Sequence, residues 1–154
     1  MTSGDQPIHR KAKDFRWEDV EVLPYKEDDR ALFKSITRQV LFSDPAQQSE
    51  LRYFEVAPGG FSTLERHLHT HNVLILRGSG QCLVGRAVRR LSTNDLVAVP
   101  PMTWHQFRAS AGEPLGFLCM VNAARDKPQL PTAEEVANLE RDPAGAAFLH
   151  SGGG

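Results

Sequence analysis

The chain has 154 residues, 40% of them hydrophobic, which is the size of one domain with one compact core. Its 18 basic and 19 acidic residues leave a net charge of -1, which argues against nucleic acid and anionic membrane surfaces as partners. No apolar run approaches the roughly 18 residues of a spanning helix, and residues 1–13 are polar rather than signal-like. The sequence therefore predicts a cytoplasmic protein.

Composition divides the chain into three segments. Residues 1–30 are charged with scattered apolar positions, and we expect an arm that packs loosely or adds an edge strand. Residues 31–125 contain short apolar stretches between turn signals, which is typical of an all-β sandwich or barrel. Residues 126–154 are predicted to form a helical tail that ends in a flexible glycine run.

The middle segment reads as consecutive strands without intervening helices. We predict strands at 33–42, 51–57, 62–67, 71–76, 81–84, 87–91, 96–99, 104–109 and 115–121. Turn residues separate them, such as Pro58-Gly59-Gly60 and Gly78-Ser79-Gly80. In the tail, Thr132 and Glu135 have the spacing of a capping box, which predicts one short surface helix that ends near Asp142-Pro143.

Residues suited to metal binding occur at two places in the sequence. Glu65 and His67 share one face of a predicted strand, with Cα atoms about 6.5 to 7 Å apart. That separation suits two donors that share one ion. His71 follows closely, and His105 lies more than thirty residues later. A histidine-rich turn can be a surface accident, but apolar residues follow His71, and a buried imidazole needs a partner.

These residues resemble the first motif of the small single-domain cupins, G(X)5HXH(X)3-4E(X)6G. Gly59 opens the motif and Gly78 closes it. Glu65 and His67 fill the paired-histidine positions, and His71 stands where the glutamate belongs. The exchange of one carboxylate and one imidazole keeps a set of three nitrogens and one oxygen.

The second cupin motif, G(X)5PXG(X)2H(X)3N, is matched in part. Pro100 and His105 hold, whereas Asn94, Met102 and Ala109 replace the two glycines and the asparagine. The resemblance implies a single cupin-type antiparallel β-barrel, jelly-roll-like, with a short C-terminal helix. It also implies a metal held by Glu65, His67, His71 and His105.

A second register of the first motif starts from the pair His67 and His69. It places Phe61 at the opening glycine and Val73 at the glutamate, and thereby loses two positions of the motif. We therefore favour the first register. His69 then lies in the turn near the barrel mouth, where it orients substrate, shuttles protons or is simply solvated.

The metal is predicted to be one divalent transition metal. Iron or manganese is favoured, because four protein ligands in an octahedral shell leave two adjacent positions for a bidentate substrate or dioxygen. Nickel, copper, cobalt and zinc suit the same ligands. Alternation along the strands predicts that Val73, Phe107, Phe117 and Cys119 line the pocket. Gln81 is added to this lining because it lies at a strand end.

Three classes of function fit this prediction. The first is a small metal-dependent oxidoreductase of the dioxygenase type that acts on a small organic substrate. The second is a non-redox isomerase, lyase or decarboxylase in which the ion polarises a carbonyl. The third is a sensor that binds a small ligand without turnover. By analogy with cupins we also expect a homodimer that pairs through residues 30–42.

Overall fold

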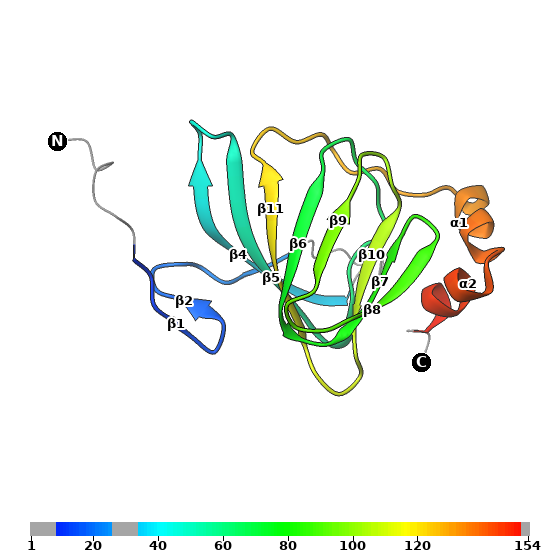
Figure 1. The fold of residues 1–154 in the computed structure, drawn as a ribbon, viewed down its shortest axis with the longest axis horizontal. Coiled ribbons are helices and arrows are strands. Elements are labelled where there is room, and N and C mark those ends of the chain that lie inside the picture. Colours follow the sequence, from blue (N-terminus) through cyan, green and yellow to red (C-terminus); the bar gives the residue numbers. More distant parts are fainter. Residues whose placement is uncertain (1–8, 26–33, 152–154) are drawn as a thin grey trace.

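The computed structural model describes residues 9–25 and 34–151, with 11 strands and two helices among them (Figure 1). The strands are β1 (Ala12–Lys13), β2 (Arg16–Trp17), β3 (Leu23–Pro24), β4 (Lys34–Asp44), β5 (Ser49–Phe61), β6 (His71–Gly78), β7 (Gly80–Val84), β8 (Ala87–Leu91), β9 (Leu96–Val99), β10 (His105–Ala109) and β11 (Leu115–Asn122). The helices are α1 (Ala133–Glu140) and α2 (Pro143–His150). None of the helices in these residues is long and apolar enough to cross a membrane.

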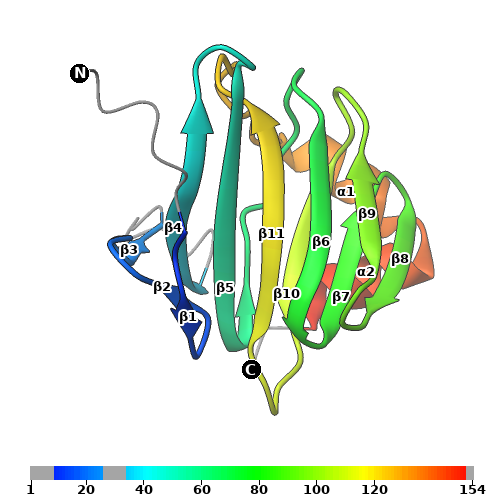
Figure 2. The ribbon, with the colours of Figure 1, turned by 60° about the vertical axis from the view of Figure 1, so that its left-hand side comes forward.

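One antiparallel sheet carries most of the chain. Its strand order is β8-β7-β10-β5-β11-β6-β9, with β4 paired to β5 and β3 to β4, and Figure 2 shows β4, β5, β11 and β6 side by side. A single core cluster joins Phe107 on β10 and Cys82 on β7 to Phe54 on β5 and Ile75 on β6. The sheet therefore folds over its own apolar face, and the prediction of an all-β cupin-type barrel is confirmed.

Strand alternation explains which side chains fill the barrel. On β11, Phe117, Cys119 and Val121 are 0 to 5% exposed, whereas Met120 between them is 53% exposed. Successive side chains of a strand point to opposite faces, so the buried set marks the inner face. The inward direction of Phe117 and Cys119, which the sequence left undecided, is thus settled.

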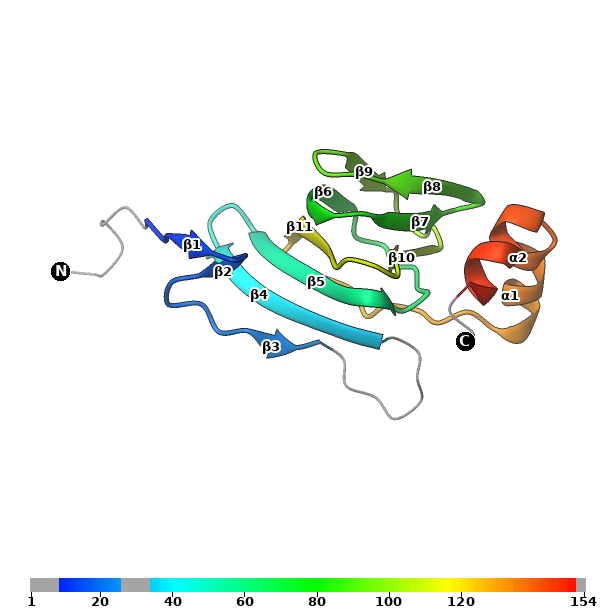
Figure 3. The ribbon, with the colours of Figure 1, turned by 90° about the horizontal axis from the view of Figure 1, so that it is seen from below.

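The N-terminal segment packs more firmly than a loose arm. Phe15 and Trp17 contact Tyr53 on the outer face of β5, with ring centroids 5.9 and 5.1 Å apart. The Gln39 side chain donates to the Phe15 carbonyl at 2.8 Å and accepts from the Trp17 amide at 3.2 Å. The β1–β2 hairpin therefore covers the outer side of the sheet, at the opposite end of the molecule from the helices (Figures 1 and 3).

The tail contains two helices rather than one. The capping box of α1 is confirmed, because Thr132 and Glu135 exchange both of its hydrogen bonds. The predicted helix ends just before Asp142-Pro143, as expected, but a second helix that was not predicted follows it: Asp142 caps α2 by accepting from the Ala144 amide, and Pro143 is its first residue. A proline after a capping residue starts a helix as readily as it stops one, since its missing amide needs no partner there.

The predicted break at Pro58-Gly59-Gly60 is also wrong, because β5 continues through it to Phe61. The Gly59 amide donates to the Ser110 carbonyl at 2.9 Å while its φ of 72° bends the strand, so pairing survives the turn-like residues. The predicted strand at 62–67 is reduced to isolated bridges at Glu65 and Arg66. The first residue predicted for the β4 region, Phe33, lies outside the described residues.

Candidate metal centre

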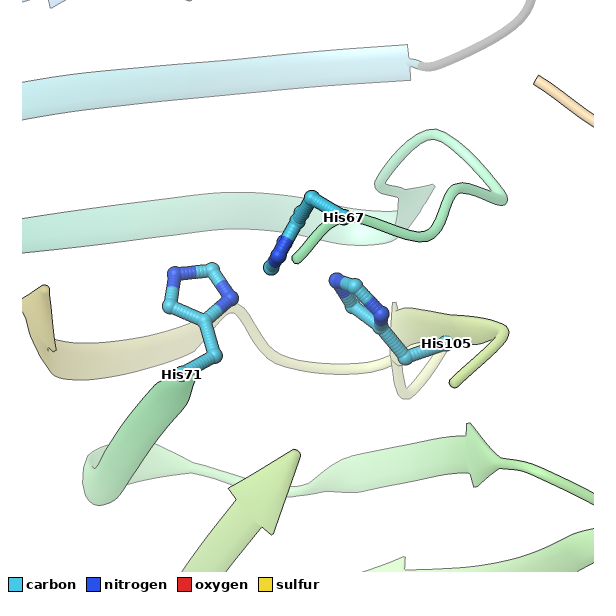
Figure 4. Close-up of side chains that lie close together, drawn as sticks. All are labelled: His67, His71 and His105. Atoms are coloured by element: carbon cyan, nitrogen blue, oxygen red, sulfur yellow. The ribbon is translucent and has the colours of Figure 1, made fainter. Parts of the chain in front are cut away.

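Three histidines from separate segments meet inside the barrel (Figure 4). His67 follows β5, His71 begins β6 and His105 begins β10. Glu65 and His105 join two of these segments, because each backbone amide donates to the other residue's carbonyl, at 3.2 and 3.0 Å. This isolated pair fixes His67 opposite His105 although nearly forty residues separate them in sequence.

The ring nitrogens of these histidines are close enough to share one ion. One nitrogen of each lies within 4.8 Å of one nitrogen of both others. His67 and His105 are 2% and 3% exposed, and the ring centroids are 4.7 to 5.7 Å apart, nearly perpendicular to one another. Figure 4 shows the three rings turned toward a common centre.

Backbone contacts fix the tautomers of His67 and His105. Nδ1 of His67 lies 2.7 Å from the His69 carbonyl, and Nδ1 of His105 lies 2.9 Å from the Thr103 carbonyl. A carbonyl oxygen only accepts, so each Nδ1 carries a hydrogen and each Nε2 has a free lone pair. A hydrogen bond from the ring nitrogen that does not bind the metal is what commonly orients metal-ligating histidines.

The inward nitrogens have no partner of their own. Nε2 of His67, Nδ1 of His71 and Nε2 of His105 are buried without a hydrogen bond. Burial lowers the pKa of His71 to about 2, with further lowering by His105 and Arg52, and it also lowers the pKa of His105. Neutral imidazoles with free lone pairs are the form that binds a metal, so the group suits one divalent transition ion.

Glu65 lies next to this group without belonging to it. Its side chain is buried, and its negative charge raises the pKa of His105 against the larger effect of desolvation. Among the described residues, the cluster of ligand atoms within 4.8 Å of one another contains the three histidines and not Glu65. A fourth, carboxylate ligand from Glu65 therefore stays a prediction.

His69 is held firmly rather than solvated. Its side chain is 10% exposed, its Nδ1 lies 2.8 Å from a carboxylate oxygen of Asp126, and its ring stacks on His67 at 3.7 Å between centroids. Asp126 also accepts from the Leu68 and His69 amides, and these hydrogen bonds lower the pKa of its carboxyl group. Sequence reasoning missed Asp126, because it follows the last strand with no motif to connect it to the histidines.

The predicted pocket residues divide into two groups. Val73, Phe107, Phe117 and Cys119 all lie in the barrel core, where Phe107 and Phe117 stack with centroids 4.9 Å apart. Gln81 instead alternates with Cys82 and faces the outer side of β7. It lines a separate cavity of about 230 Å³ with Gly59 and Arg108, and no histidine contributes to that lining.

Arg52 is a site residue that the sequence analysis did not single out. Its Nη2 lies 3.4 Å from Nε2 of His71 and 3.5 Å from Sγ of Cys119. Burial raises the pKa of the Cys119 thiol to about 11, and the Arg52 charge opposes this shift. The available signal was its alternation with Phe54 and Val56, which places a cation at an inward position of β5.

The glycine positions of both cupin motifs have left-handed backbone conformations. Gly59 and Gly78 have φ values of 72° and 73°, and Asn94 and Met102, at the glycine positions of the second motif, have 77° and 55°. At Gly78 an added Cβ would collide with the Pro114 carbonyl oxygen, so glycine is required there. The left-handed turns are therefore preserved without glycine at two of the four positions.

Comparison with known proteins supports this description. The family model described as a cupin domain matches residues 52–121. The chain is 57% identical over 148 residues to 1-methylthio-D-xylulose 5-phosphate methylsulfurylase of Rhodospirillum rubrum, covering 96% of this chain and 95% of that protein.

Two crystal structures are similar over nearly the whole chain. A cupin 2 conserved barrel domain protein from Rhodopseudomonas palustris superimposes with a TM-score of 0.87 at 55% identity, covering 92% of this chain and 98% of that one. A cupin-2 domain protein from Rhodospirillum rubrum gives a TM-score of 0.86 at 56% identity, covering 97% and 100%.

Proposed function

Because the chain belongs to the cupin family, we propose that it is a metal-dependent enzyme that cleaves the carbon–sulfur bond of a methylthio ketose phosphate. The observation that carries the proposal is the convergence of three buried histidines, each with an unpartnered nitrogen, in a chain so similar to a methylsulfurylase. The substrate class follows from that relative's name: a 2-ketose with a methylthio group on C1 and a phosphate on C5.

The three histidines suit this substrate chemically. A divalent metal bound to them would supply a Lewis acid that polarises the C2 ketone. Phe107 and Phe117 give the interior an apolar wall that excludes water and accommodates a thioether. His67 and His105 are oriented by backbone carbonyls and therefore need no rearrangement before they bind.

We assign the thiol of Cys119 as the acceptor of the methylthio sulfur. Its thiolate attacks the thioether sulfur, an S–S bond forms, and the C1–S bond breaks with its electron pair left on C1 beside the ketone. C1 then takes a proton, and an external thiol reduces the methyl disulfide on Cys119. Arg52 supports this role, because its guanidinium lies 3.5 Å from the sulfur and offsets part of the rise in the thiol pKa that burial causes.

The dioxygenase-type reaction favoured from sequence requires oxygen, whereas this reaction does not. Metal-loaded protein is incubated anaerobically with a methylthio ketose 5-phosphate and a thiol reductant, and the products are followed by NMR. We expect the 1-deoxy ketose phosphate to accumulate without oxygen, and the Cys119→Ser variant to lose at least 100-fold in rate. Substrate loss that depends on oxygen would instead support the dioxygenase.

The next question is whether the chain pairs with a second copy of itself. We propose a homodimer, since Val40 and Phe42 on β4 are 37% and 46% exposed in the region predicted to pair. A Phe42→Glu variant should then elute as a monomer, as measured by light scattering. A monomeric wild type would contradict the dimer, and a dimeric variant would contradict pairing through Phe42. A cytoplasmic location and the lack of nucleic-acid and membrane partners stay predictions from composition.

A further inference from the structure

We propose that Arg38 and Arg52 form the binding site for the phosphate group of the substrate, on the inner face of β4 and β5. The identity of the phosphate carrier rests on the function proposed above. The site itself rests on the placement, burial and missing partners of these two side chains.

Strand register places the two arginines side by side. Arg38 pairs with Phe54, and Val40 pairs with Arg52, so Arg38 and Arg52 are diagonal neighbours on one face of the sheet. Such diagonal positions lie about 7 to 8 Å apart, within reach of long side chains. Phe54 belongs to the barrel core, which identifies this face as the inner one.

An aromatic pair holds both guanidinium groups. The Arg52 guanidinium lies over the Phe54 ring at 4.8 Å, the Arg38 guanidinium lies over the Tyr25 ring at 5.4 Å, and the two rings meet edge to face at 4.9 Å. Stacking uses the flat faces of the guanidinium groups and leaves their N–H edges for an acceptor. The two cations are therefore pre-positioned with donors to spare.

Apart from the Cys119 sulfur, which accepts from Nη2 of Arg52, the protein provides few acceptors for these donors. The Arg52 side chain is 6% exposed, yet its nearest carboxylate, Glu50, is 3.6 Å away and is shared with Arg125. Nε of Arg52 and Nε of Arg38 are both buried without a hydrogen bond. Arg38 makes no salt bridge with any acidic residue in the described ranges. Guanidinium groups whose Nε donors are buried and unused favour an anion as the missing partner.

The contact with His71 points the same way. When Nδ1 of His71 binds a metal, its Nε2 carries the hydrogen and becomes a donor. Nη2 of Arg52, 3.4 Å away, is also a donor, so in that tautomer the two groups could not be joined by a hydrogen bond. An anionic oxygen beside them would accept from both, on the side of the His71 ring opposite Nδ1. In the substrate, three carbon–carbon bonds separate the ketone carbon from the phosphate-bearing carbon.

Another buried arginine has a structural role, although its Nε also lacks a hydrogen bond. Arg108 lies between the rings of Phe61 and Phe148, at 4.5 and 5.2 Å, and donates to the Leu149 carbonyl at the end of α2. It thus links the barrel to a helix terminus. Neither Arg52 nor Arg38 donates to a helix terminus in the described residues, and a phosphate would accept both guanidinium forks in the geometry that arginine recognises best.

The test is binding without turnover. Titration calorimetry on metal-loaded protein compares D-xylulose 5-phosphate with D-xylulose for the wild type and for Arg38→Gln, Arg52→Gln and Arg52→Lys. We expect each glutamine variant to bind the phosphorylated ketose roughly 10- to 100-fold more weakly, because a charge-assisted hydrogen bond is lost. Affinity for D-xylulose should change less than about threefold, and Arg52→Lys should recover part of the loss.

The matched control is Arg86→Gln, which removes the same charge from an exposed contact with Asn138 on α1. It should bind both sugars as the wild type does. Unchanged phosphate-ketose affinity in both glutamine variants, or an equal loss for the two sugars, would overturn the site. Binding that depends on these arginines without any carbon–sulfur cleavage would overturn the proposed function alone, and cleavage unaffected by the variants would overturn the phosphate site alone.

Discussion

The histidine cluster and the surface beneath the C-terminal helices are both well buried, but their interiors differ in kind. Under the helices, Leu139 and Phe148 pack against Leu83 of β7, and capping residues satisfy both helix starts. Around the histidines, buried ring nitrogens and guanidinium atoms lack partners. The first region contributes stability and leaves Nε of Arg108 without a partner, whereas the second keeps several such polar atoms, among them three ring nitrogens that one ligand could satisfy together.

The first test of this difference is a variant in the surface beneath the helices. Phe148 is 2% exposed and packs against Leu83 and Leu139, so Phe148→Ala should lower the free energy of unfolding by about 3 to 5 kcal/mol. Metal stoichiometry at a temperature where the variant is folded should remain that of the wild type. Urea unfolding and elemental analysis measure the two quantities, and a loss of metal would show that the regions are not independent.

The converse experiment removes a ligand. His71→Ala should weaken metal affinity by more than 100-fold, about 2.7 kcal/mol, since even residues behind the ligands contribute 10- to 100-fold. The stability of the metal-free protein should change by less than about 1 kcal/mol, because Nδ1 of His71 makes no hydrogen bond within the protein. His150→Ala, on the exposed end of α2, is the control. Full metal occupancy in His71→Ala would contradict the assignment of these histidines as the metal centre.

The carboxylate that the sequence predicts as a fourth ligand needs its own variant. Glu65→Gln keeps the shape and the backbone pair with His105 but removes the charge. If Glu65 binds the metal, affinity should fall at least tenfold, about 1.4 kcal/mol, and elemental analysis under limiting metal measures it. Affinity within twofold of the wild type would reduce the ligand set to three histidines.

Acid should destabilise the metal-free protein through the histidine region. An unfolded histidine titrates near pH 6.5, whereas burial lowers the pKa of folded His71 to about 2 and also lowers that of His105. Below pH 6.5 the unfolded chain takes up protons that the folded chain does not. The free energy of unfolding should therefore be fully retained above pH 6.5 and fall below it, by up to about 1.4 kcal/mol per pH unit for each histidine.

Urea unfolding of the metal-free protein at pH 7, 6 and 5 measures this slope. In the His71→Asn variant one titrating group is gone, so the slope should decrease by up to about 1.4 kcal/mol per pH unit. The same slope in wild type and variant would mean that His71 is not the group held neutral by burial.

The sequence predicted the barrel because alternation and turn residues act locally. It also grouped His67, His71 and His105 through the spacing of the two cupin motifs, although His67 lies in the loop between β5 and β6 and not on the predicted strand. The residues that contact the histidine cluster from other strands could not be predicted from the sequence. Arg38 and Arg52 become neighbours only through the register of β4 on β5, which no local pattern encodes.

The tail shows the same limit. Asp142-Pro143 is a valid stop for one helix and a valid start for the next, and packing of Phe148 on the barrel decides between them. Asp126 likewise acquires its role from the return of the chain beside the loop that holds His69. Contacts that depend on long-range register could not be predicted from residue type and spacing alone.

The smallest effect tests whether the two regions communicate. Arg66, next to His67 in sequence, lies 3.4 Å from Glu135 in the first turn of α1, so one ion pair joins the helix to the metal centre. Thr132→Ala removes the capping hydrogen bond to the Glu135 amide and should lower the free energy of unfolding by about 1 kcal/mol. Exposed ion pairs contribute little, so metal affinity should stay within about twofold. A larger loss of affinity, measured alongside Glu134→Ala as the control in the same turn, would mean that the helix positions His67 through Arg66.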